Sequence, residues 1–183
     1  MNETMNETMK DKQLKLAEKE GAKKGQDIIG LRDIGGVNYF HVALEHCDGN
    51  WELVGSAMKA ANITAGNIAK AFLSASEDRL CIYLHVPESL SDTVTLKDWF
   101  SVLVQGSKAT VLHNSTNDSK NENKTKNEGK WGFAKAELLR SDNVFPLKVR
   151  DEIIGQGFAY LVSKGVIPDD DSDEYEINDN VEW

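Results

Sequence analysis

The chain has 183 residues and a formal net charge of −9, from 30 acidic and 21 basic side chains. This length fits one domain with a sizeable core, and the overall acidity argues against a generally basic nucleic-acid binder. No apolar run reaches the roughly 18 residues that a membrane span needs, and no secretion signal is visible, so we expect a soluble, cytoplasmic protein with no membrane partner.

The charge is unevenly distributed along the chain. Eight acidic residues lie within 169–183, which leaves 22 acidic against 21 basic side chains elsewhere. We therefore expect an acidic C-terminal tail over 169–183, a single domain over 28–168 and a polar N-terminal arm over 1–27. Because the charges of the domain over 28–168 nearly balance, one of its faces can still be basic.

The N-terminal arm is rich in lysine and poor in apolar side chains. Between residues 10 and 24, the large aliphatic residues are Leu14 and Leu16, whereas the lysines are Lys10, Lys12, Lys15, Lys19, Lys23 and Lys24. Burial of so few apolar side chains would offset little of the conformational entropy that is lost when the arm is ordered. The composition therefore predicts a flexible arm. A frayed, lysine-rich helix is the alternative.

The domain begins with a strand and a helix. Alternation over 39–46 predicts a strand that buries Phe40, Val42 and Leu44. A turn at 48–50 then caps a helix over 51–62, whose apolar residues recur at helical spacing.

A hairpin and a second helix follow. Residues 69–74 and 80–86 read as two strands, and Thr95 with Asp98 resembles a capping box. The apolar spacing of the next residues predicts a helix over 96–104.

Further strands are predicted over 108–113 and 131–139. Between them, residues 114–130 contain no large apolar side chain, which predicts a disordered insertion. Pro146 suits the first turn of a last helix that ends before Gly165. The order β-α-β-β-α-β-β-α predicts an α/β fold of the α+β type, a mixed sheet of about five strands with helices packed on one face.

Motifs for catalysis are missing from the sequence. There is no Cys-x-x-Cys, no nucleophile elbow and no phosphate-binding loop, and the spacing of His41 and His46 sends them to opposite faces of a strand. The two cysteines, Cys47 and Cys81, fit reduced thiols, and Cys81 reads as an inert thiol. We expect no enzyme, no metal and no cofactor.

One basic neighbourhood contains an aromatic side chain. Trp131 lies beside Lys130 and Lys135, and the adjoining insertion carries Lys120, Lys124 and Lys126. Such a group can stack a base and hold phosphates, although a solvated loop explains the same residues.

The stretch VGSAMKAANITAGNIAKAFLSASEDRLCIYLHVPESLSDTVTLKDWFSVLV, residues 54–104, resembles the C-terminal domain (C-Ala) of alanyl-tRNA synthetase. The order of a small-residue helix, a hairpin and the Trp99 helix carries the resemblance, which extends over roughly residues 37–165. It implies a non-catalytic accessory domain that binds tRNA and can form a homodimer. Its glycine loop, which faces nucleic acid, would correspond to Gly129, Lys130, Gly132, Ala134 and Lys135.

The leading hypothesis is therefore a non-enzymatic accessory protein that binds tRNA or another RNA. The alternative is a protein-interaction module that uses the open face of the sheet and the acidic tail, with Tyr175, Ile177 and Trp183 as apolar anchors. An enzyme is the third possibility.

Overall fold

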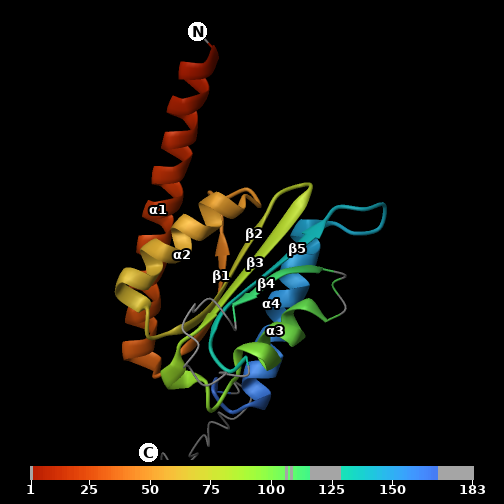
Figure 1. Ribbon diagram of the computed structural model, residues 1–183. Coiled ribbons are helices and arrows are strands. Elements are labelled where there is room, and N and C mark those ends of the chain that lie inside the picture. The colour runs from red at the N-terminus through yellow and green to blue at the C-terminus, as the bar shows by residue number, and fades with distance from the viewer. Residues whose placement is uncertain (1, 106, 108, 116–128, 169–183) are drawn as a thin grey trace, which may run out of the picture.

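The computed structural model describes residues 2–105, 107, 109–115 and 129–168 (Figure 1). Its elements follow one another in the order α1 (Asn2–Gly35), β1 (Tyr39–Leu44), α2 (Trp51–Ala65), β2 (Ala69–Ala75), β3 (Arg79–Val86), η1 (Glu88–Leu90), α3 (Leu96–Val104), β4 (Thr110–Ser115), β5 (Gly132–Leu139) and α4 (Pro146–Ser163). The predicted α+β class is confirmed. The long helix α1 and the short 3-10 turn η1 were not part of the predicted order.

The strands form one mixed sheet with the order β1-β2-β3-β5-β4. β1 and β2 are parallel and are joined by the crossover helix α2. The remaining neighbours are antiparallel, and the pairing of β4 with β5 has a register shift between Val111 and His113. β2 and β3 therefore form the predicted hairpin in the middle of the sheet.

Helices lie on both faces of the sheet, which corrects the prediction that they pack on one face (Figure 1). One core contains Leu80, Ile82 and Leu84 of β3 together with α3 and α4. The other contains Phe72 and Cys81 together with α1 and α2. The strands carry apolar side chains in both alternating positions, so each face needs a cover.

α1 also corrects the predicted flexible arm over residues 1–27, because residues 2–27 belong to this helix. Its close packing on α2 uses small residues. A methyl group at Gly21 would overlap the carbonyl oxygen of Ala57, and one at Gly25 would come 2.8 Å from that of Ala61. The Glu20 carboxylate accepts hydrogen bonds from the backbone N–H groups of Glu45 and His46, at 2.7 and 3.0 Å.

Three local signals are confirmed. The Asn50 side chain accepts from the backbone N–H groups of Glu52 and Leu53 at the start of α2, and Thr95 accepts from Asp98 at the start of α3. Pro146 occupies the first turn of α4. No helix of the described part of the chain is long and apolar enough to cross a membrane.

Candidate nucleic-acid interface

The predicted glycine loop serves first as a cap for α3. The carbonyl oxygens of Gly129 and Lys130 accept hydrogen bonds from the backbone N–H groups of Lys97 and Leu96, at 2.9 and 2.7 Å. Gly129 and Gly132 have φ angles of 80° and 117°, which favour glycine. The Lys130 side chain is exposed and Trp131 is half-buried. These residues therefore have a clear structural role at the start of β5.

Lys135 is the predicted contact residue that the structure brings to an aromatic surface. Its Nζ atom lies 4.6 Å from the ring centroid of Tyr83 and 5.8 Å from that of Trp51. The other predicted lysines, Lys120, Lys124 and Lys126, lie outside the described residues, as do the predicted partner anchors Tyr175, Ile177 and Trp183.

Around Lys135, aromatic rings from α2, β3 and β5 form a continuous chain of contacts. Trp51 and Tyr83 are 6.3 Å apart between centroids, and Tyr83 and Phe133 are 5.7 Å apart. Phe133 in turn stacks on His85 at 4.5 Å. We call this surface the sheet patch and define it as Trp51, Tyr83, His85, Phe133 and Lys135.

Strand alternation and register place these residues side by side. Tyr83 is the direct partner of Lys135 across β3 and β5, and His85 is the partner of Phe133. Alternate side chains of a strand point to the same face, so all four lie on the side of the sheet that carries α1 and α2. On the opposite side, the intervening residues Leu84 and Ala134 are buried.

The sheet patch keeps part of its surface accessible because α2 packs over β2 and the near side of β3. Tyr83, Phe133 and Lys135 are all half-buried, as is Trp51 at the start of α2. Burial raises the pKa of the Tyr83 phenol, which therefore stays neutral at physiological pH. The patch offers ring edges, ring faces and one ammonium group to a ligand.

A charged pair closes one end of the sheet patch. The Glu137 carboxylate lies 3.7 Å from the Arg79 Nε atom, and the Trp51 indole N–H donates to it at 3.4 Å. The negative charge of Glu137 would repel an anion at that end, although the positive charges of Arg79 and Lys135 partly compensate for it. Phosphate groups would therefore be favoured along the lysine side of the patch.

Below the other end lies the buried ammonium group of Lys70. Its Nζ atom donates to the carbonyl oxygens of Ala65 and Ile68 at the end of α2, at 2.6 and 2.9 Å, and lies 3.4 Å from Nδ1 of His85. Burial lowers the pKa of Lys70 to about 7. Burial and the charge of Lys70 lower the pKa of His85 to about 3. Neutral His85 thus provides a flat, uncharged support for Phe133.

Burial also shifts the pKa values of the two cysteine thiols and of the half-buried His41. Burial raises the pKa of Cys47 and of Cys81 to about 12, and the Cys81 thiol donates to the carbonyl oxygen of Gly49. On the opposite face, His41 accepts a hydrogen bond from the Trp99 indole at 3.2 Å, and burial lowers its pKa to about 4. Cys81 and His41 therefore each have a hydrogen-bond partner within the fold.

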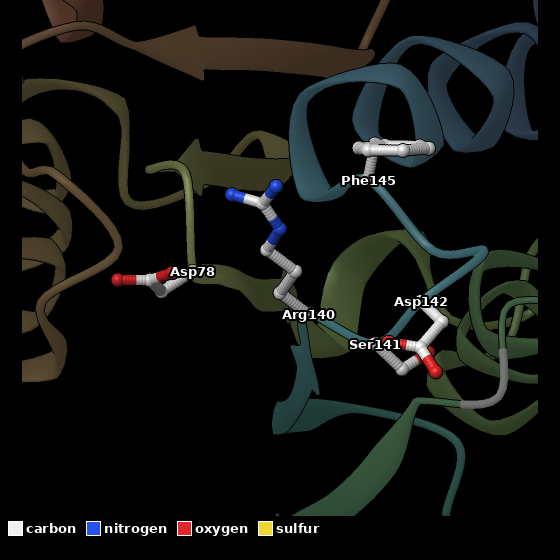
Figure 2. Close-up of a pocket in the computed structure, with 5 residues that line it drawn as sticks. All are labelled: Asp78, Arg140, Ser141, Asp142 and Phe145. Atoms are coloured by element: carbon white, nitrogen blue, oxygen red, sulfur yellow. The ribbon is translucent and has the colours of Figure 1, made fainter.

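A shallow polar pocket lies at the end of the sheet where β5 leads into α4. Figure 2 shows Arg140 between Asp78 and Phe145, with the Asp78 carboxylate pointing away from the guanidinium group. The guanidinium carbon lies 5.7 Å from the Phe145 ring centroid. Ser141 and Asp142 complete the lining. The two carboxylates disfavour an anion beside Arg140, and the lining contains no histidine that could activate Ser141.

Potential metal ligands also stay apart in the described ranges of the chain. Among the described residues, no group of three or more His, Cys, Asp or Glu side chains could hold a metal ion. At the sheet patch, aromatic rings and a cation lie side by side, and both can contact a ligand.

Sequence reasoning did not single out Trp51, Tyr83, His85 or Phe133 as functional residues. Tyr83 and His85 alternate with the leucines and isoleucine of β3, and Phe133 alternates with the alanines of β5. Aromatic residues in the outward register of two neighbouring strands were the signal that could have found them.

Comparison with protein-family models finds no matching family, and comparison with curated proteins finds no significant match. The resemblance to the C-Ala domain stays a prediction.

Proposed function

We propose that the chain is a non-catalytic RNA-binding accessory protein that holds unpaired bases on the sheet patch. The observation that carries this proposal is the pairing of Tyr83 with Lys135 next to Phe133 on adjacent strands. Single-stranded RNA is commonly recognised by aromatic side chains on a sheet, on which bases stack, and by cations that hold the backbone.

The resemblance to C-Ala favours tRNA as the RNA. Lys120, Lys124 and Lys126 of the insertion belong to the proposal as phosphate contacts on sequence grounds, and Lys130 and Trp131 lie at the start of the strand that carries Phe133 and Lys135. Phosphate contacts position an RNA without reading its sequence. Affinity should therefore fall as salt rises.

The test is the binding of a fluorescent single-stranded RNA to the full chain at ~50 and ~200 mM salt. Tyr83→Leu removes one stacking platform and should weaken binding by about fivefold or more, because stacking contributes about 1–3 kcal/mol per base. Phe158→Leu is the matched control, since Phe158 is 49% exposed on α4, on the other side of the sheet.

Two results would contradict the proposal. One is the absence of RNA binding at ~50 mM salt, and the other is binding that Tyr83→Leu leaves unchanged. If RNA does not bind and Tyr83→Leu instead abolishes capture of a cellular protein, the protein-interaction alternative replaces it.

A further inference from the structure

A row of lysines runs along the outer side of α1. Steps of three and four residues return to the same side of a helix, and Lys12, Lys15, Lys19 and Lys23 follow these steps. All four are exposed. At 1.5 Å per residue, the row is about 16 Å long. We call these four residues the lysine row.

The opposite side of α1 is packed on α2, which fixes the direction of the lysine row. Ala17, Gly21, Gly25 and Ile28 are buried in this seam. Lys19 and Gly21 are two residues apart, about 200° around the helix axis, so the lysines point away from α2. The bonds of Glu20 to the end of β1 prevent α1 from rotating.

The lysine row keeps its charge available to a ligand. Lys10, on the side of α1 that faces α2, pairs with Glu52 at 3.0 Å, whereas the ion pairs found in the described part of the chain involve none of the four lysines in the row. Asp11 and Asp27 lie four residues from Lys15 and Lys23 without pairing with them. The row therefore presents four like charges on one straight side of a helix.

We propose that the lysine row binds the phosphodiester backbone of an RNA duplex. This inference rests on the proposed function and extends it, because the sheet patch then holds unpaired bases of an RNA that also contains a stem. A duplex hides its bases and exposes closely spaced phosphates, which suits a straight row of cations with no aromatic side chain among them.

An anionic membrane fits this row less well. A helix that lies in a membrane surface inserts its apolar side, whereas the small and apolar side of α1 is already packed on α2. An acidic protein segment is the remaining competitor, and the experiment below includes it.

The experiment compares two quadruple variants of the full chain, which change the net charge equally. One carries K12Q, K15Q, K19Q and K23Q, and the control replaces four other exposed lysines by glutamine, at Lys59, Lys97, Lys148 and Lys164. Lysine and glutamine have similar helix propensities, so α1 should stay helical, which circular dichroism checks. The probe is a blunt RNA duplex of ~20 base pairs.

We expect the slope of log affinity against log salt to become shallower by about 3–4 in the lysine-row variant, since each lost phosphate contact contributes about 0.9. The control set should change it by less than about 1. An equal change in both variants, or none in either, would overturn the inference. So would polyglutamate that competes as well as duplex RNA at equal charge.

A parallel measurement with single-stranded RNA separates this inference from the proposed function. If Tyr83→Leu weakens single-strand binding while the lysine-row variant binds duplex RNA like the parent, the inference fails and the proposed role of the sheet patch is supported. If the lysine row controls duplex binding but single strands do not bind, the inference stands and the proposed role of the sheet patch fails.

Discussion

The two faces of the sheet differ in how completely helices cover them. Beneath α3 and α4, the inward side chains of β3 and β5 are buried, and Trp99 is 0% exposed. Beneath α1 and α2, coverage ends partway along β3, so Tyr83, Phe133 and Lys135 remain half-buried. Both sides of β5 follow the same alternation, yet one side carries alanines and the other Phe133, Lys135 and Glu137.

This difference separates a buried face from a face that keeps polar and aromatic side chains partly accessible. The closed face is packed with aliphatic and aromatic side chains, and His41 on this face accepts a hydrogen bond from the Trp99 indole. The half-covered face places aromatic rings next to ionisable groups and keeps them partly accessible, an arrangement that suits contact with a ligand. Substitutions on the two faces should therefore have different consequences.

The largest expected effect is on the free energy of unfolding, and a comparison of two tryptophans measures it. Trp99→Ala should lower the free energy of unfolding by about 3–5 kcal/mol, because it leaves a cavity in the closed face. Trp51→Ala, at the half-buried edge of the sheet patch, should lower it by about 1 kcal/mol. Urea unfolding measures both. Equal losses would mean that the two faces are equally closed.

The seam that holds α1 on the half-covered face can be tested with two glycines of the same helix. Gly21→Ala forces a methyl group against the Ala57 carbonyl and should destabilise the protein by about 1–3 kcal/mol. Gly30→Ala meets no atom within 4 Å and should stabilise it by up to about 1 kcal/mol through helix propensity. Protease cleavage within α1 should increase only for Gly21→Ala, and the reverse order would contradict the packing of α1.

On the half-covered face, protonation of His85 should make the stability of the protein depend on pH. Its pKa falls from 6.5 to about 3 on folding, so the unfolded chain binds the extra proton between these values. The resulting stability is fully present above pH 6.5 and is lost as pH falls towards 3. His85→Gln should flatten this loss by about 1.4 kcal/mol per pH unit, measured by urea unfolding between pH 6 and 4. His46→Gln, at an exposed position, is the matched control, and identical pH profiles for His85→Gln and the parent would refute the assignment.

The smallest expected effect concerns the cation of the sheet patch. Lys135→Met removes contacts with Tyr83 and Trp51 and should lower stability by only about 0.5–1 kcal/mol. The same variant should reduce the salt slope of single-strand RNA binding by about 0.7. Lys148→Met, on an exposed part of α4, should leave that slope unchanged. If Lys135→Met instead caused a large loss of stability and left the salt slope of RNA binding unchanged, Lys135 would have a structural role and no role in RNA binding.

Part of the candidate site could be predicted from the sequence. Lys135 was named because it follows Trp131 in a basic neighbourhood, and the structure places it in the sheet patch. Lys130 was named for the same reason and Gly129 from the resemblance to C-Ala, but the carbonyl groups of both residues cap α3. Proximity along the chain could not distinguish these roles, because neighbouring residues at a strand start point in different directions.

The sequence by itself determined the strands, the helices α2, α3 and α4 and three helix-start signals, but not α1. Asn50, Thr95 and Pro146 act within one helical turn, so their short-range signals were readable without the fold. Only the tertiary structure decided that α1 is docked and that helices cover both faces. Contacts such as Gly21 with Ala57 and Glu20 with Glu45 join residues 25 or more positions apart. Local periodicity contains no information about such partners. These long-range contacts fix where α1 and α2 lie on the sheet, and the sheet patch is the part of that face that the two helices do not fully cover.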